Sequence, residues 1–189
     1  HFKSSNDVAH PLTDDPNKTI KVIICIFLMV ATFSIYSQIQ DHEFLNYDDD
    51  EWVTESSLVQ AGLTNESIIR VFTTKHFGSW LPITSLSYML NYELHGLNPA
   101  GYLLTNLFLH IANILTLFIV LSRMTGAIWQ SAFVAAMVAF HPLNVEAVAW
   151  IAERKNVLST LFWLLTMWAY IHYVEKPTIK RYGLVFLFF

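Results

Sequence analysis

Three long apolar runs alternate with polar segments along the chain, at residues 20–37, 102–121 and 157–173. Each has about 17 to 20 residues, the length with which an α-helix crosses the hydrocarbon core of a bilayer. A fourth run, residues 131–140, is shorter. It either includes residues 127–130 or ends part-way, with the next segment at the membrane interface. A fifth run follows "EKPTIKR", and we interpret the chain as the front part of a larger membrane protein.

This pattern predicts an all-α, polytopic membrane protein. Residues 1–19 are a polar tail, residues 20–37 the first transmembrane helix, residues 38–100 a long outer loop, and residues 101–189 further transmembrane helices with a second outer loop at residues 141–156. Within the first loop, Thr64 precedes an amphipathic stretch, which predicts a short helix at the interface. Pro82 then breaks the local pattern, and the aromatic residues around it are typical of an interfacial belt.

Composition and charge add an orientation. Hydrophobic residues make up 54% of the chain and charged residues 14%, against about 25% charged residues in a soluble domain. No basic patch indicates nucleic-acid binding. Because cytoplasmic loops are enriched in Lys and Arg, the cations near the span ends predict a cytoplasmic N-terminus and two outer loops on the opposite face. These cations are Lys18, Lys21, Arg123, Lys176, Lys180 and Arg181.

Negative charge is concentrated in the first outer loop. Seven of the fifteen acidic residues lie between Asp41 and Glu55, and four of them follow one another from Asp48 to Glu51. Adjacent carboxylates repel one another, which raises the pKa of one of them unless a cation pairs with it. Such a group suits a general base or a divalent-metal site. The alternative is a solvated acidic loop, but its position close to the end of a span favours a function.

The second outer loop reads "HPLNVEAVAWIAERKN". On one helix Glu146, Trp150 and Glu153 share a face, whereas Arg154 and Lys155 point elsewhere. Two adjacent cations on the outer side oppose the usual charge bias. A lipid-linked phosphate would explain them, because Arg binds phosphate through two N–H groups and Lys adds a point charge. The alternative is a set of surface ion pairs that contribute little.

A polar stripe runs along the span at residues 102–121, formed by Asn106, His110 and Asn113. Polar side chains at membrane depth are costly unless they face other helices or a cavity. Hydrogen bonds between helices are the simpler interpretation, especially for Asn113. A place in the functional site is the alternative for His110.

Three stretches together resemble a known family: "NYDDD", "GLNPAGYLLTNLFLHIANIL" and "FHPLNVEAVAWIAERKNVLSTLFWLL". They are similar to the GT-C membrane glycosyltransferases, and more closely to the protein O-mannosyltransferase-like branch known as transmembrane and tetratricopeptide-repeat proteins, with its bacterial relatives. The resemblance covers about residues 44–176. It implies a GT-C-like transmembrane bundle with an extended first outer loop.

The resemblance also implies an activity and a site. Members transfer a sugar, with inversion, from a polyprenyl-phosphate donor to an acceptor on the lumenal or periplasmic face. By this match Asp48 is the general base and Asp49 places the acceptor or a divalent metal. The residues expected around the donor phosphate are His141, Glu146, Glu153, Arg154 and Lys155, with His110 as a further candidate.

The expected partners are membrane lipid and either a protein acceptor or the subunits of a membrane complex. The membrane is a bacterial inner membrane or an ER-type membrane. The alternative function is a non-catalytic, GT-C-derived subunit or scaffold in a larger complex. A transporter is disfavoured, because no inverted repeat is visible in the spans.

Overall fold

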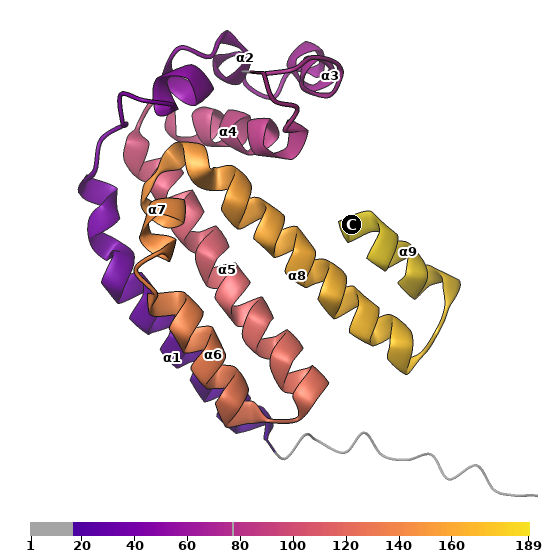
Figure 1. The fold of residues 1–189 in the computed structure, drawn as a ribbon. Helices are drawn as coiled ribbons and strands as arrows, with labels where there is room; N and C mark the ends of the chain where they lie inside the picture. Colours follow the sequence, from indigo (N-terminus) through magenta and orange to yellow (C-terminus); the bar gives the residue numbers. More distant parts are fainter. Residues whose placement is uncertain (1–16, 77) are drawn as a thin grey trace, which may run out of the picture.

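A computed structural model of the chain describes residues 17–76 and 78–189, and these residues are helical apart from turns, connections and one isolated β-bridge between His76 and Ser79. Most of the predicted tail, residues 1–16, lies outside the described residues. Figure 1 shows a bundle of long helices with shorter helices across one end. In chain order the elements are α1 Lys18–Tyr36, η1 Ser37–Asp41, η2 Asp50–Thr54, α2 Ser57–Gln60, α3 Asn65–Thr73, α4 Pro82–His95, α5 Pro99–Thr125, α6 Ile128–Phe140, α7 Asn144–Ala149, η3 Ile151–Glu153, α8 Arg154–Glu175 and α9 Ile179–Phe188.

Three helical stretches are long and apolar enough to cross a membrane: Lys18–Asp41, Pro99–Thr125 and Ile151–Glu175. They correspond to the three long runs of the sequence, so those predictions are confirmed. α6 has 13 residues, which is about 20 Å at 1.5 Å per residue and too short to span alone. α6 and α7 follow one another along α5 (Figure 1), so the return path from the α5 C-terminus is a broken helix.

The break between α6 and α7 has a local cause. His141 adopts an extended backbone after α6, as expected for a residue that precedes a proline, here Pro142. The Asn144 side chain donates a hydrogen bond to the carbonyl of Val138 and satisfies one open group at the α6 C-terminus. The chain breaks again at Trp150, which is also extended.

The second break corrects one expectation. Glu146, Trp150 and Glu153 do not share a face of one helix, because α7 ends before Trp150 and a separate 3₁₀ turn carries Glu153. The spacing argument assumed an unbroken helix through residues 144–155.

The segment between α1 and α5, predicted as the first outer loop, folds into a cap over one end of the bundle (Figure 1). α3 begins at a capping box, in which the Thr64 and Ser67 side chains bond each other's backbone N–H groups, and this confirms the predicted short helix. The sequence pattern did not predict α4. Pro82 lies in its first turn, where a missing N–H leaves no hydrogen bond unmade.

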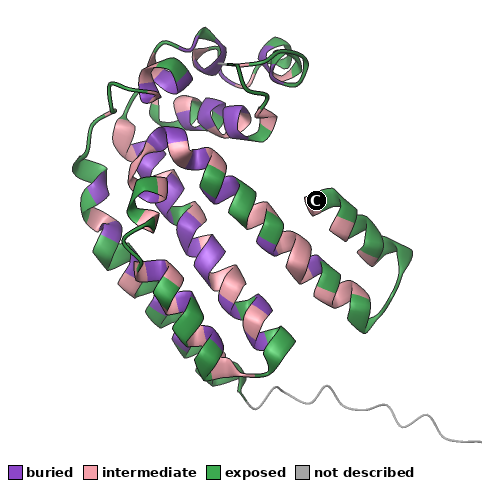
Figure 2. Cartoon of the chain, in the orientation of Figure 1, coloured by how far each residue is buried: buried purple, intermediate pink, exposed green. Residues whose placement is uncertain are grey.

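Buried side chains form two clusters, and Figure 2 shows them concentrated along α5 and beneath the cap. One cluster joins the cap to the upper part of α5 and to α7. The other packs α1, α5 and α6 together near the opposite end. On α6, Ser131, Ala135 and Ala139 are buried at four-residue spacing, and the two alanines belong to this second cluster. Small residues at this spacing let neighbouring helices approach closely within a membrane.

A single buried cation links three helices beneath the cap. Arg154 begins α8 and is 0% exposed. Its Nε donates to Asn106 Oδ1 on α5 at 2.8 Å, and its Nη2 donates to the Tyr102 carbonyl at 2.8 Å. Its Nη1 bonds Ser87 and Asn91 on α4.

The rings around Arg154 complete this enclosure. The guanidinium carbon lies 4.6 Å from the ring centre of Tyr88 and 5.6 Å from that of Tyr102, distances at which an aromatic face stabilises a cation. The Tyr88 hydroxyl donates to the Ile151 carbonyl at 2.7 Å. α4, α5 and the start of α8 are therefore held together around one charge.

Two asparagines fix α8 against α5. Asn106 Nδ2 donates to the Trp150 carbonyl at 3.0 Å, and Asn113 Nδ2 donates to the Val157 carbonyl at 2.9 Å. Both donors and both acceptors are seven residues apart in the same chain direction, so the two segments run parallel. For Asn106 and Asn113, the interpretation of the polar stripe as bonding between helices is confirmed.

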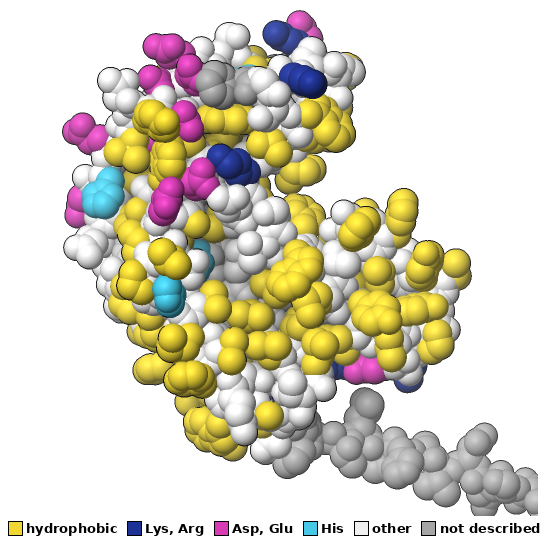
Figure 3. Space-filling view, in the orientation of Figure 1, with side chains coloured by type: hydrophobic (Ala, Val, Ile, Leu, Met, Phe, Trp, Pro, Cys, Tyr) yellow, Lys and Arg dark blue, Asp and Glu magenta, His cyan; other side chains and the backbone are white. Residues whose placement is uncertain are grey.

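Charge separates along the bundle. At the end opposite the cap, Arg123 bonds both oxygens of Glu175 through Nε and Nη2, and Lys21 lines a hollow with Arg123. Acidic side chains gather around the capped end in Figure 3. Three of the cations used for orientation, Lys21, Arg123 and Arg181, therefore lie near one another, and the acid run lies at the other end.

Replacing Arg154 tests the buried network. We expect Arg154→Met to lower the free energy of unfolding by about 3 kcal/mol, because several buried acceptors lose their donor at roughly 1–3 kcal/mol each. Thermal unfolding of the purified chain in detergent measures this. Lys155→Met is the matched control, since it removes the neighbouring, partly exposed charge. Equal unfolding midpoints for the two variants would contradict the assignment.

Candidate functional site

Asp49 joins the cap to the segment that precedes α8. Its side chain is 1% exposed. One carboxylate oxygen accepts the Leu45 N–H at 3.0 Å, and the other accepts the Ala152 N–H at 2.8 Å. Leu45 belongs to the turn after η1, and Ala152 belongs to η3, directly before Arg154. The acid run is therefore pinned against the start of α8. We call this pair of hydrogen bonds the Asp49 clamp.

The electrostatics of the acid run follow from this burial. Burial raises the pKa of the Asp49 carboxyl, and the hydrogen bonds from the Leu45 and Ala152 backbone oppose that shift. Loss of solvation and then the neighbouring charges of Asp50 and Asp48 raise the pKa of Glu51.

An open hollow of about 620 Å³ lies beside the clamp. One wall is the turn at residues 42–45, and the other is α7 with Trp150. Trp150 lines the hollow, and its ring lies 5.9 Å from that of Tyr47, which is 73% exposed. Polar groups and an aromatic face border the hollow, a combination suited to an extended polar ligand. Its lining residues are His42, Glu43, Phe44, Leu45, Val145, Glu146, Ala149 and Trp150.

A second hollow, of about 180 Å³, carries the lysine of the motif. Lys155 lines it together with the first turn of α4 and the α8 side chains Leu158 and Phe162. Lys155 Nζ lies 2.9 Å from Glu153 Oε1, and Asn156 bonds the other carboxylate oxygen of Glu153. The hollow thus has a charged end and an apolar wall that continues down a membrane helix. Figure 3 shows a basic side chain beside acidic ones on this part of the surface.

Comparisons with known proteins identify sequence relatives of a large part of the chain. The chain is 39% identical over 94 residues to human protein O-mannosyl-transferase TMTC2, covering 49% of this chain and 11% of that protein. It is 33% identical over 110 residues to Tmtc1 of Drosophila melanogaster, covering 58% and 12%. It is 27% identical over 162 residues to Tmtc2 of the same organism, covering 80% and 17%. The chain is a distant homologue of the TMTC protein O-mannosyl-transferases.

This homology confirms the family resemblance seen in the sequence. The homology covers only a small part of these relatives, because the chain spans between 11% and 17% of the length of the three TMTC proteins. Their properties as whole proteins are therefore not assigned to this chain on homology alone. No family model matches the chain, and no solved structure matches it.

The fold brings some of the predicted residues together. Asp48 is half-buried beside the Asp49 clamp, and Glu146 lines the larger hollow. Glu153 and Lys155 are an ion pair at the smaller one. These four residues therefore lie on the segments that the clamp joins.

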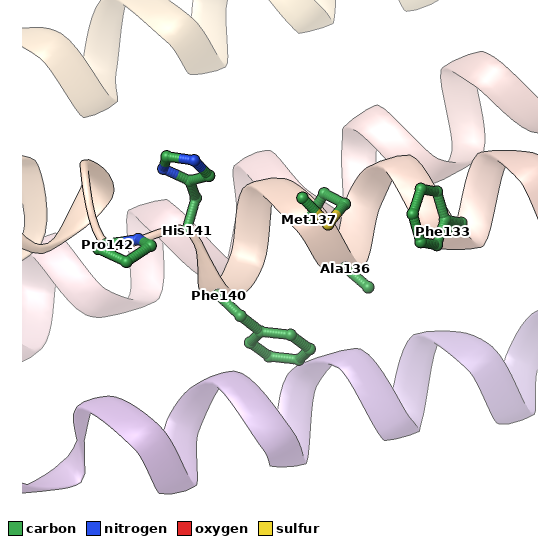
Figure 4. A pocket seen from close by; sticks show the side chains of 6 residues that line it. All are labelled: Phe133, Ala136, Met137, Phe140, His141 and Pro142. Atoms are coloured by element: carbon green, nitrogen blue, oxygen red, sulfur yellow. The ribbon is translucent and has the colours of Figure 1, made fainter.

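Other predicted residues lie apart. Arg154 faces inward, and its N–H groups are used by protein oxygens, so in this structure it is not available to a phosphate. His110 is 4% exposed within α5, with its ring 5.6 Å from that of Tyr36. His141 is exposed at the end of α6, in an apolar hollow of about 200 Å³ on the outside of that helix (Figure 4).

Within the described residues no three His, Cys, Asp or Glu side chains lie close enough to hold a metal ion. The consecutive acids Asp48 to Glu51 do not converge, because Asp49 turns inward to the clamp. Sequence reasoning also missed His42 and Glu43 in the larger hollow. No motif marks them, and only the folded turn brings them opposite α7.

The Asp49 clamp makes the stability of the chain depend on pH. Because the folded pKa of Asp49 is above its ordinary value, the folded state holds the proton more tightly than the unfolded chain does. The contribution of Asp49 to the free energy of unfolding is fully present below the ordinary carboxyl pKa of about 3.9. It is lost as the pH rises through the raised pKa.

Asp49→Asn should remove this contribution and one of the two hydrogen bonds. We expect a lower unfolding midpoint than that of the wild type, with the gap largest at acid pH and narrowing as the pH rises. Thermal unfolding in detergent over a pH series measures it, with Asp50→Asn as the control. A gap that widens with pH would show that the clamp favours the ionised carboxylate.

Proposed function

We propose that this chain is part of a membrane O-mannosyltransferase of GT-C type. It transfers a sugar from a polyprenyl-phosphate-linked donor to a protein hydroxyl. The capped end faces the lumen or periplasm of an ER-type or bacterial inner membrane, and the cationic end with the N-terminus faces the cytoplasm. The gathering of Lys and Arg at the end opposite the cap supports this orientation.

One observation carries the proposal, namely the 2.8 Å hydrogen bond from the Ala152 N–H to Asp49. It connects residues 103 positions apart in the chain. Through it, the acid run lies beside the segment that carries Glu153 and Lys155. In a chain homologous to O-mannosyl-transferases, this is the placement expected of a base and a phosphate-binding group that act on one substrate pair.

Asp48 is the general base in this proposal. It takes the proton of the acceptor hydroxyl, whose oxygen forms a bond to the anomeric carbon of the sugar as the bond from that carbon to the phosphate oxygen breaks. The polyprenyl phosphate leaves as an anion. Its developing negative charge is stabilised by the Lys155 ammonium at the smaller hollow.

The hollows suggest a place for each substrate. The apolar wall formed by Leu158 and Phe162 suits the polyprenyl chain, and Lys155 at its end suits the phosphate. The larger hollow, with Glu43, Glu146 and Trp150, suits the acceptor, because an aromatic face and carboxylates fit a polar peptide or sugar. Arg154 and Asp49 hold these surfaces in place from within.

The second candidate function is a non-catalytic membrane subunit derived from the same fold. The enclosure of Arg154 favours it, since the stronger phosphate-binding cation of the motif is used for structure. The two functions differ in one property that can be measured directly, the transfer of sugar by the chain.

Replacing single aspartates separates the candidates. The chain, purified into lipid nanodiscs that contain polyprenyl-phosphate mannose, is incubated with a Ser- and Thr-rich peptide, and mass spectrometry measures the mannosyl-peptide. We expect Asp48→Asn to lower the rate by about 10²–10⁴-fold, the usual contribution of a general base. Asp50→Asn is the matched control and should stay near the wild-type rate.

Donor binding is measured in the same nanodiscs with Lys155→Gln. Weaker donor binding with an unchanged unfolding midpoint would support the phosphate role. A wild-type chain that transfers no mannose and binds the donor no more tightly than Lys155→Gln would favour the non-catalytic subunit. An equal loss of rate in Asp48→Asn and Asp50→Asn would refute Asp48 as the base.

A further inference from the structure

The sequence holds two Asn-X-Ser/Thr motifs, Asn17-Lys18-Thr19 and Asn65-Glu66-Ser67. This motif is the acceptor for N-linked glycans in chains that enter the secretory pathway. The two motifs lie at opposite ends of the bundle, because Asn17 directly precedes α1 and Asn65 begins α3 in the cap (Figure 1). Glycans are added only on the lumenal side of an ER-type membrane, so at most one of the two motifs can receive one.

Asn65 is in a position that can carry a glycan. Its side chain is exposed, and its amide group forms no hydrogen bond within the part of the chain that the structure describes. Residues 42–64 separate it from the first candidate span, and residues 66–98 separate it from the second. α3 packs on α2 and α4, and in Figure 1 it lies well away from α7, which borders the larger hollow. A bulky group on Asn65 would therefore leave that hollow open.

The hydroxyl of this motif is enclosed once the cap has folded. Ser67 is 2% exposed. Its Oγ donates to the Gly62 carbonyl at 2.6 Å and accepts the Thr64 N–H at 3.0 Å, as part of the capping box of α3. The motif requires a hydroxyl at its third position, and in the folded cap an enzyme cannot reach this one. Transfer of a glycan to Asn65 must therefore precede the closure of the capping box.

We propose that Asn65 is N-glycosylated while the chain is being inserted into the membrane, before α3 forms. This inference rests on the orientation given in the proposed function, in which the cap faces the lumen. The Asn65 Nδ2 forms a bond to the anomeric carbon of a lipid-pyrophosphate-linked oligosaccharide as the bond from that carbon to the phosphate oxygen breaks. The lipid pyrophosphate leaves with the electron pair, and the amide loses one proton to the oligosaccharyltransferase. The glycan then keeps the start of α3 in water.

Translation of the full chain in the presence of ER microsomes tests this proposal, with gel mobility compared before and after endoglycosidase H. We expect one glycan on the wild type, none on Asn65→Gln or Ser67→Ala, and an unchanged glycan on Asn17→Gln. Ser67→Thr keeps the hydroxyl and should keep the glycan. Thr64→Ala is the matched control for Ser67→Ala, because it opens the same capping box but leaves the motif intact. It should be glycosylated at least as fully as the wild type.

An epitope tag at the N-terminus measures the orientation separately, through its digestion by protease added outside the sealed microsomes. A digested tag on a chain without a glycan would overturn the glycosylation of Asn65 and leave the orientation standing. A tag protected from the protease would refute the orientation in the proposed function, and this inference with it. A glycan that persists in Asn65→Gln, or that Thr64→Ala loses as Ser67→Ala does, would also contradict the assignment.

Discussion

The fold depends on a buried guanidinium that has no carboxylate partner among the described residues that enclose it. Transfer of such a charge out of water costs several kcal/mol, and here the compensation comes from dipoles and aromatic faces. Two asparagine oxygens, backbone carbonyls and two tyrosine rings surround Arg154. Because these groups come from α4 and α5, and Arg154 itself begins α8, the charge can be accommodated only when all three helices are in place. A partly assembled cap would leave it exposed to lipid.

The network around Arg154 positions the residues of the candidate site. Ala152, which holds Asp49, lies two residues before Arg154, and Lys155 follows it directly. The clamp, the buried cation and the partly exposed lysine are thus close together in one short segment of the chain. A chain that keeps Arg154 enclosed also keeps the acid run and Lys155 on neighbouring surfaces, whether or not it transfers a sugar.

The sequence predicted the long helices, the capping of α3 and the gathering of cations at one end, because each of these follows from local periodicity or from charge near a helix terminus. It did not predict α4, the breaks around α7 or the inward turn of Asp49. A proline such as Pro82 breaks a helix when it lies in the interior, but it is favoured in the first turn, so the sequence alone does not distinguish the two cases. Asp49 and Asp48 have the same side chain, and only contact with a segment 103 residues away distinguishes them. In the sequence Arg154 resembles a surface cation, because the groups that enclose it lie on α4 and α5, far from it in the chain.

The paired asparagines on α5 and the break after α6 give the two halves of the bundle different tolerance to insertions. One residue inserted between Asn106 and Asn113 would rotate the second about 100° around the helix axis relative to the first. That rotation would take it away from the Val157 carbonyl. A residue inserted at the Pro142 break falls between two helices that belong mainly to different clusters, α6 in the lower one and α7 in the upper one. Length variation among homologous sequences should therefore be found at the break and be absent from α5.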